Sequence, residues 1–288
     1  MKLVERYGSF MGSTDSYEAA DTVIVGVPMD FTVSYRPGSR FAAQALRNVS
    51  YALEEDSVYL DRDLADYTYC DWGDINLPMG NVVASLELIA QVAGKLCVDG
   101  KFPVFVGGEH LISYPVVSEV YKKYPNLVVL HFDAHADLRQ DYLGETNSHA
   151  TVMRKVAELI GGKNLYQFGI RSGTREEFAY ARANTNIYID QVLAPLKQVV
   201  ESIGDRPVYI SIDIDVVDPA FAPGTGTVEP GGISARELID AVHTMGKLKV
   251  VGFDIVEIAP AFDQSERTAL LGAKIIRESI LAFTKPRT

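Results

Sequence analysis

The chain alternates short apolar runs with segments of helical periodicity. Apolar runs flanked by Gly, Pro or Asp predict buried strands at residues 22–27, 102–106, 127–132, 165–170, 208–214 and 249–255. Because these runs lack a polar alternate face, they are typical of parallel strands that helices cover on both sides. We therefore expect a mostly parallel sheet in the interior of the protein.

Helical periodicity fills the segments between these runs. Apolar residues spaced three and four apart predict amphipathic helices over residues 82–98, 192–203 and about 269–283. A further helix begins at a capping box of Ser234 and Glu237 and ends at Gly246. The alternation predicts a three-layer α/β/α fold, and we expect residues 1–288 to form a single domain.

Composition and charge narrow the class of protein. Of 288 residues, 47 % are hydrophobic, and 38 Asp and Glu exceed 27 Lys and Arg, giving a formal net charge of −11. An acidic chain without a local basic cluster argues against nucleic-acid binding and favours a small cationic or neutral partner. No apolar stretch approaches the roughly 18 residues of a membrane span, so we expect no membrane association. Cys70 and Cys97 are too few for a disulfide framework, so we expect structural cysteines and a cytoplasmic location.

Acidic and histidine side chains gather where three predicted strands end. An Asp-x-His-x-Asp segment follows the strand at 127–132, an Asp-x-Asp segment ends the strand at 208–214, and Gly-Gly-Glu-His follows the strand at 102–106. Alternate residues of an extended chain share one side, and the carboxyl ends of parallel strands are where such sheets bind ligands. Six candidate metal ligands result: His110, Asp133, His135, Asp137, Asp213 and Asp215.

The four clustered aspartates would repel one another unless cations lay between them, and two divalent ions would balance their charge. Imidazole and carboxylate ligands without thiolates suit manganese, iron, cobalt or zinc, and the large share of carboxylates favours manganese. Two ions that share a water lower its pKa and supply hydroxide near neutral pH. The pattern therefore predicts a dinuclear metal centre that generates a nucleophile.

Other polar residues near these strands receive separate interpretations. His149, in the long loop after the Asp-x-His-x-Asp segment, is the candidate for proton transfer, and Glu257, after the last strand, is a candidate to bind a cationic substrate. We expect His131 to be a hydrogen-bonded core histidine rather than a ligand, and Asp254 to accept from a buried donor. His243 lies on the capped helix and is predicted to be at the surface.

Taken in order, the three strand-end segments resemble the signature blocks of the ureohydrolase family, which contains arginases and agmatinases. Segments at 26–30, 36–38, 71–74, 218–227 and 257–260 are also similar to that family. The resemblance implies an arginase-like fold that holds two Mn(II) ions per subunit. One ion would be bound by His110, Asp133, Asp137 and Asp213, and the other by Asp133, His135, Asp213 and Asp215.

The resemblance also implies the reaction, which is hydrolysis of a guanidinium group to release urea. It assigns proton shuttling to His149, orientation of the hydroxide to Asp137, and guanidinium binding to Glu257 with help from Thr227. Because members of the family form trimers or hexamers, we expect a homotrimer or a homohexamer.

The loop before His149 bears on the substrate. Arg139 stands where arginases usually carry an Asn, and the short loop that follows contains Asp141 and Glu145, which suit an amine without a carboxylate. We therefore expect agmatine as the substrate, with putrescine and urea as products.

Other interpretations remain beside this one. Guanidinobutyrate, aminopropylagmatine and arginine are alternative substrates, and a one-zinc deacetylase of the related fold or a non-catalytic protein are alternative functions. The chain departs from the usual family pattern at Ala150, at the alanine pair 42–43 and at Val228, and none of these is a proposed ligand.

Overall fold

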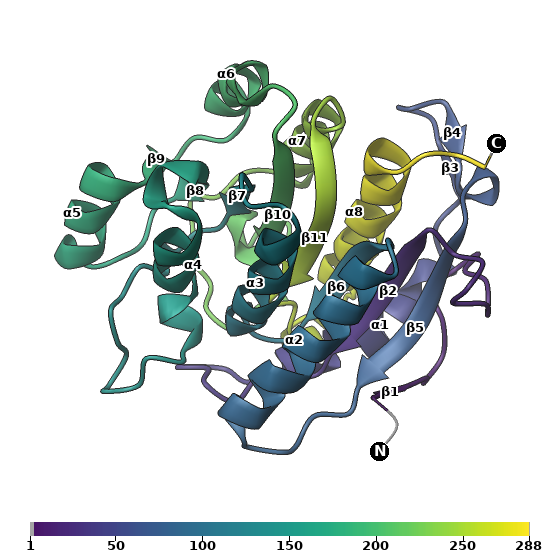
Figure 1. Cartoon of the computed structure of the whole chain (residues 1–288), viewed down its shortest axis with the longest axis horizontal. Helices are drawn as coiled ribbons and strands as arrows, with labels where there is room; N and C mark the ends of the chain where they lie inside the picture. The colour runs from purple at the N-terminus through teal and green to yellow at the C-terminus, as the bar shows by residue number, and fades with distance from the viewer. Residues whose placement is uncertain (1–2, 288) are drawn as a thin grey trace.

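A central sheet organises the computed structural model, which describes residues 3–287. Its nine strands pair in parallel except at one edge, where β1 runs antiparallel to β5. Figure 1 shows the sheet between layers of helices. In sheet order the strands are β1 Val4–Glu5, β5 Tyr69–Ile75, β2 Thr22–Val27, β6 Phe102–Gly107, β11 Lys249–Val256, β10 Pro207–Asp213, β7 Val128–Phe132, β8 Leu165–Ile170 and β9 Asn186–Ile189.

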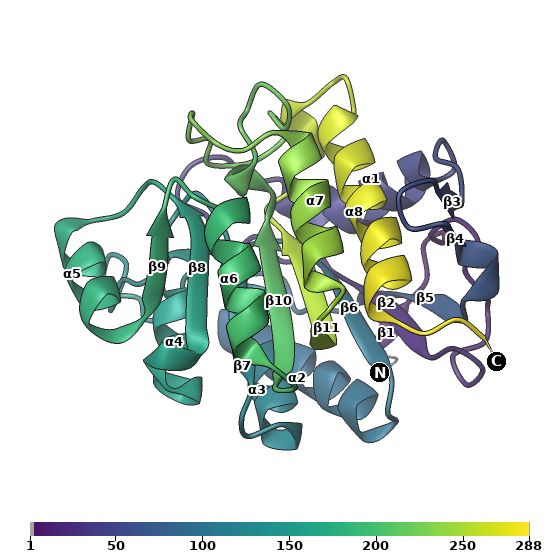
Figure 2. The same ribbon diagram turned by 90° about the horizontal axis from the view of Figure 1, so that it is seen from above.

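Helices bury apolar residues against both faces of this sheet, and Figure 2 shows α6, α7 and α8 side by side over one of them. That layer contains α1 Ala42–Ser50, α6 Leu193–Ile203, α7 Ala235–Met245 and α8 Arg267–Phe283. The opposite layer contains α2 Val82–Val98, α3 Ser113–Lys123 and α4 Val152–Ile160, with α5 Arg175–Asn184 beside the β9 edge. A small hairpin of β3 Asp56–Ser57 and β4 Arg62–Asp63 lies outside the sheet. The predicted three-layer α/β/α fold is confirmed.

The apolar pattern located most of the interior. All six predicted strands are present, and β2, β8 and α2 begin and end at the predicted residues. The predicted capping box is also present, since the Glu237 amide donates to Ser234 Oγ at 3.2 Å where α7 begins. The strands are predictable because burial on both faces requires a largely apolar run.

Two kinds of element were not predicted. Strand β5 was missed because Asp71, Gly73 and Asp74 interrupt its apolar run, although most of the strand is buried. Helix α5 was missed because it is largely polar, yet a capping box of Thr174 and Glu177 marks its start. Helices α1, α3 and α4 and the short edge strands β1 and β9 were missed as well.

A close backbone approach aligns two loops at the carboxyl edge of the sheet. Strands β2 and β6 pair in register, with Val27 opposite Gly107. A Cβ atom on Gly108 would lie 1.7 Å from the carbonyl oxygen of Met29, so this position requires glycine. The next amide, that of Glu109, donates to the same oxygen at 2.7 Å. The loops after β2 and β6 are therefore held together at this edge.

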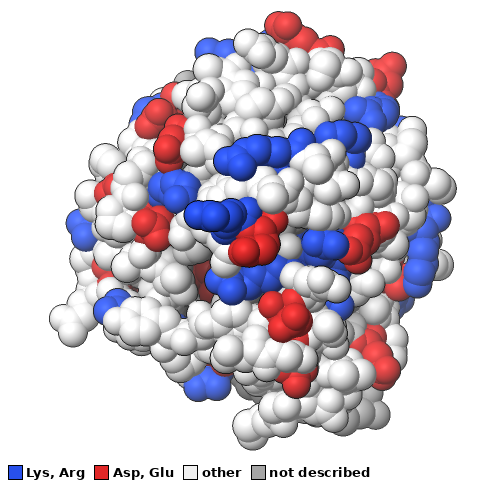
Figure 3. All heavy atoms as spheres, turned by 90° about the vertical axis from the view of Figure 1, so that its left-hand side faces the viewer, with Lys and Arg blue, Asp and Glu red and all other residues white. Residues whose placement is uncertain are grey.

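Within residues 3–287, no helix is long and apolar enough to cross a lipid bilayer. Figure 3 shows the side of the molecule at the left of Figure 1, where Lys and Arg lie among Asp and Glu. The surplus of acidic residues is therefore not gathered into a single patch on this face.

A buried ion pair attaches α1 to β5. Arg47 Nε donates to Asp71 Oδ2 at 2.7 Å, and its Nη1 donates to Asp74 Oδ1 at 2.7 Å. The Arg47 side chain is 4 % exposed and that of Asp71 is 0 % exposed. Because buried carboxylates are costly without a partner, Arg47 is what allows the two aspartates to lie in this strand.

Replacing Arg47 with Ala is expected to lower the melting temperature. Removing one partner of a buried pair costs about 3–5 kcal/mol, which for a chain of this size corresponds to a fall of about 6–20 °C. Lys95→Ala is the matched control, because its ion pair with Asp99 is solvent-exposed and is worth less than about 1 kcal/mol. Equal melting temperatures for the two variants, measured by calorimetry, would contradict this account.

Candidate metal and catalytic site

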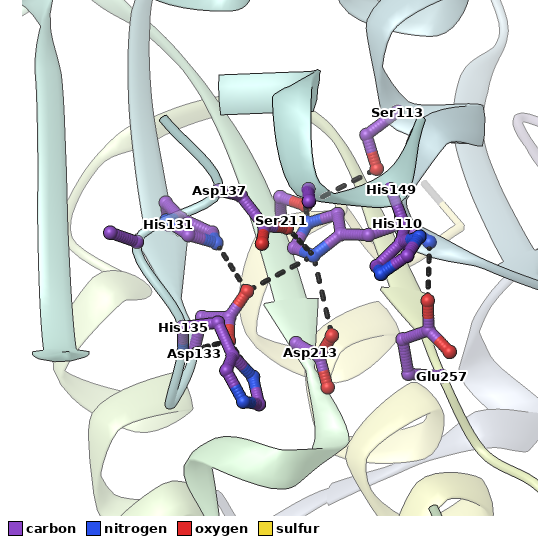
Figure 4. A network of polar contacts seen from close by, with 12 residues as sticks. His110, Ser113, His131, Asp133, His135, Asp137, His149, Ser211, Asp213 and Glu257 are labelled. Carbon is purple, nitrogen blue, oxygen red and sulfur yellow. Dashed lines mark hydrogen bonds and ion pairs between the residues drawn. The ribbon is translucent and has the colours of Figure 1, made fainter. Parts of the chain in front are cut away.

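Four adjacent strands end at the site. In the order β6, β11, β10 and β7, they are followed by or end in His110, Glu257, the 213–215 segment and the 133–137 segment. All six predicted metal ligands are brought together at this edge, and Figure 4 shows His110 among the aspartates that surround it.

The imidazole of His110 lies at the centre of the aspartates. Its Nδ1 is 3.1 Å from Asp133 Oδ2 and 3.3 Å from both Asp137 Oδ2 and Asp213 Oδ2. These spacings suit atoms that ligate a common ion through bonds of about 2.0–2.2 Å. Nδ1 is buried and has no hydrogen-bond partner within the described chain.

A second contact on the same ring fixes its tautomer. His110 Nε2 lies 2.9 Å from Ser211 Oγ, and the Ser211 hydroxyl donates to Asp254 Oδ1 at 2.7 Å. Since the single hydroxyl proton of Ser211 is used in this bond, Ser211 accepts from His110 Nε2–H. A neutral ring therefore turns the lone pair of Nδ1 toward carboxylate oxygens, and only a cation or a proton satisfies that arrangement. The aspartate Asp254 accepts from buried donors, as expected.

A second set of ligand atoms adjoins the first. His135 Nδ1 lies 2.9 Å from Asp215 Oδ2 and 3.5 Å from Asp133 Oδ1. Ligand atoms of these three residues all lie within 4.8 Å of one another. Because Asp133 faces both His110 and His135, the two sets share a carboxylate, as two neighbouring ions would require.

The pKa shifts report the same concentration of negative charge. Burial, followed by the nearby carboxylate of Asp133, raises the pKa of Asp137 well above its usual value, and burial with Asp215 does the same for Asp213. Burial by itself lowers the pKa of His110, but Asp133 and Asp213 raise it well above its usual value. The cluster thus favours positive charge at its centre, which fits divalent cations.

The backbone conformation of the two acidic segments differs from the prediction. An extended chain was expected to place the Asp-x-His-x-Asp and Asp-x-Asp residues on one side. Instead, Asp137 has a left-handed φ of 53°, and Asp215 lies in a 3-10 turn, Ile214–Val216, where its own amide donates to Asp213 Oδ1 at 2.9 Å. The expected alternation is therefore wrong beyond the strand ends, where tight turns direct the side chains to the same point.

His131 contributes a contact that the sequence did not indicate. Its Nε2 lies 2.8 Å from Asp133 Oδ2, and its Nδ1 accepts from Gln167 Nε2 at 3.1 Å. Both ring nitrogens are hydrogen-bonded, as expected for a core histidine, and the ring also orients a candidate ligand. The prediction for His243 is wrong, because its Nε2 lies 2.7 Å from the buried Glu278 and its side chain is only 17 % exposed.

The cluster forms the floor of a cavity of about 330 Å³. The predicted proton-transfer and substrate residues, His149, Glu257 and Thr227, all lie in its wall. Sequence reasoning gave no role to other wall residues, including Arg36, Tyr142, Glu177 and Glu229. Arg36 lies in the family-like segment 36–38 and Glu177 caps helix α5, but neither pattern by itself indicates a place in the cavity wall.

Two residues of the cavity wall are well defined: Glu257 in its orientation and His149 in its protonation. Glu257 has a left-handed φ of 62°, and its Oε1 accepts from the His110 amide at 2.8 Å, which aims the carboxylate along the cavity edge. Burial lowers the pKa of His149 to about 4, so its imidazole is neutral near pH 7. A neutral imidazole can accept a proton and then donate it.

Similarity to known proteins agrees with this geometry. Residues 20–282 match the sequence profile of the Arginase family. The chain belongs to the arginase family. It is 53 % identical to the agmatinase of Bacillus subtilis (strain 168), over 99 % of this chain and 100 % of that protein.

More distant members of the arginase family also cover most of the chain. The mitochondrial guanidino acid hydrolase of Homo sapiens is 33 % identical over 95 % of this chain and 81 % of its own length. The crystal structure of the agmatine ureohydrolase of Thermoplasma volcanium superposes with a TM-score of 0.89 at 32 % identity, over 97 % of this chain and 95 % of that one. Family membership therefore extends over the fold and the site together.

Metal counting tests the ligand set of this arginase-family site. We expect the wild type to bind two Mn²⁺ ions per chain and Asp215→Asn to bind about one, because the substitution removes a charge from the set around His135, and turnover should fall at least 100-fold. Asp218→Asn is the matched control, since the Asp218 carboxylate accepts from loop amides such as Gly231 and faces no candidate ligand. Unchanged metal content in Asp215→Asn would refute the assignment.

Proposed function

We propose that this protein hydrolyses agmatine to putrescine and urea with two divalent metal ions, and that manganese is the favoured metal. The observation that carries the proposal is the buried His110 Nδ1, which turns its lone pair toward three aspartates at the floor of a cavity. Identity of 53 % to an agmatinase over its full length supports the substrate.

Six residues would hold the two ions. We assign one ion to His110, Asp133, Asp137 and Asp213, and the other to Asp133, His135, Asp213 and Asp215. When bound, such a pair of ions makes hydroxide available near neutral pH and stabilises developing negative charge. Asp137 is then placed to accept a hydrogen bond from the attacking hydroxide and to orient it.

Glu257 and Thr227 are proposed to bind the guanidinium. A partly buried carboxylate suits a planar cation with several N–H donors, and the His110 amide already fixes one oxygen of Glu257. A guanidinium fixed in this position has its carbon near the hydroxide, and this orientation lowers the activation barrier. The exposed Thr227 lies in the cavity wall and adds a polar group.

His149 is proposed to carry the proton to the leaving amine. Attack of hydroxide on the guanidinium carbon gives a neutral tetrahedral species, which collapses to urea when the C–N bond to the amine breaks. That nitrogen must be protonated first, because an amide anion is a very poor leaving group. The neutral imidazole of His149 takes up a proton from the attacking group and delivers it to this nitrogen.

A guanidino acid is the second candidate substrate, because two arginines lie in the cavity wall and would attract a carboxylate. Each arginine is partly engaged elsewhere. Arg139 Nε lies 3.6 Å from Glu177 Oε2, and Arg36 lies over the ring of Phe262 with its Cζ 5.2 Å from the ring centroid. The carboxylate of Glu229 also lines the cavity and favours an amine instead.

The continuous sheet supports a single domain over residues 1–288. A homotrimer or homohexamer is proposed from the family resemblance alone, and two free cysteines support a reducing cytoplasm. A one-zinc deacetylase would need fewer ligands than the six that meet at this site.

Agmatine and 4-guanidinobutyrate form a matched pair for testing substrate choice, because they differ in carrying an amine or a carboxylate at the far end. We expect kcat/KM for agmatine to exceed that for 4-guanidinobutyrate by at least about tenfold, equivalent to about 1.4 kcal/mol. Urea release by the Mn²⁺-loaded protein is the measurement. A preference for the acid would overturn the choice of agmatine, and no urea from either compound or from arginine would overturn the proposed function.

His149→Asn is expected to lower kcat by about 100-fold to 10,000-fold, the usual contribution of a positioned proton-transfer group. Both bound ions should remain, because His149 is not in the ligand set. His243→Asn is the matched control: it loses its bond to Glu278 and some thermal stability, but keeps kcat within about twofold of the wild type. Full activity of His149→Asn would contradict its role.

A further inference from the structure

The imidazole of His149 needs a defined tautomer for the role proposed above, and the loop after β2 supplies a hydroxyl beside it. Thr32 Oγ1 accepts from the His149 amide at 3.0 Å and lies 3.5 Å from His149 Nδ1. Thr32 is not among the described residues that line the cavity.

A buried carboxylate fixes the direction of that hydroxyl. Glu109 is 0 % exposed, and its Oε2 accepts from the Thr32 amide at 2.7 Å and from the Thr32 hydroxyl at 2.9 Å. A hydroxyl has one proton to donate. Because that proton points to Glu109, Thr32 Oγ1 can only accept from the side of His149.

The contact between the loops is rigid. Gly108 approaches Met29 so closely that no side chain fits, and the Glu109 amide donates to the Met29 carbonyl at 2.7 Å. Glu109 and Thr32 thus follow neighbouring strands of the sheet, β6 and β2, whose pairing holds them beside the 137–150 loop that carries His149.

We infer that Thr32 is a positioning residue that holds the proton of neutral His149 on Nδ1, so that Nε2 keeps its lone pair for proton transfer in the cavity. Ser148 is the competing group, since its Oγ lies 3.4 Å from Nδ1 and its hydroxyl proton is free to point there. The inference rests on the proposed function for its effect on turnover, but the tautomer itself is independent of substrate.

The tautomer is tested by ¹⁵N NMR of histidine-labelled, Mg²⁺-loaded protein, with His149→Asn used to assign the resonance. We expect the Nδ1-protonated form of His149 in the wild type and in Thr32→Ser, and loss of that preference in Thr32→Val. The Nε2-protonated form in the wild type would overturn the inference whatever the substrate is.

Kinetics test whether the contact matters for turnover. Thr32→Val is expected to lower kcat about 10-fold to 30-fold with KM within about twofold, whereas Thr32→Ser restores kcat and Ser148→Ala stays within about threefold of the wild type. In a His149→Asn background, adding Thr32→Val should change kcat less than twofold, because the two residues act as a unit.

Three results would overturn the inference while leaving the proposed function intact. In the first, Thr32→Val keeps the wild-type kcat while His149→Asn loses it. In the second, Ser148→Ala lowers kcat as much as Thr32→Val does. In the third, Thr32→Val lowers kcat by the same factor in the wild-type and His149→Asn backgrounds. Full activity of His149→Asn would instead remove the proton role of His149, and with it the proposed mechanism.

Discussion

Repulsion among buried carboxylates is the constraint on which the site depends. Four aspartates end or follow two neighbouring strands, β7 and β10, and burial denies them the water that would otherwise separate their charges. The arrangement is tolerable only when positive charge lies between them. The acidic strand ends, which would be unfavourable without a cation, therefore form a cluster suited to binding metal.

The orientations of the candidate ligands His110 and Asp133 depend on hydrogen bonds from residues outside the ligand set. Ser211 and Asp254 hold the ring of His110 with Nε2 protonated, and Gln167 holds His131 against Asp133. These contacts run through β10, β11, β7 and β8, so the sheet itself determines where ligand atoms point. Outer hydrogen bonds of this kind fix the tautomer of a ligating histidine and the orientation of a carboxylate.

The cavity above the cluster is assembled from loops that belong to distant parts of the sequence. The loop after β2 contacts the one after β6 through a glycine, and the loop after β7 returns His149 to them. The wall of the cavity therefore comes largely from loops, whereas the candidate metal ligands lie at strand ends. This division explains how relatives named for different guanidino substrates share one fold.

The sequence by itself determined six of the nine strands of the sheet to within one residue at each end, and the six candidate ligands that converge at its edge. It could do so because burial on both faces demands continuous apolar runs, and because each acidic segment follows such a run directly. It failed where polar residues are buried by pairing, as in β5, whose aspartates depend on Arg47 from α1. It also failed for Asp137 and Asp215, whose side chains are aimed by tight turns rather than by strand alternation. The turns at Asp137 and Asp215 are local, but they follow no hydrophobic pattern from which they could be predicted. Only the tertiary structure decided the pairing of Arg47 with β5 and the contact of Thr32 with His149, because each joins segments that no local pattern brings together.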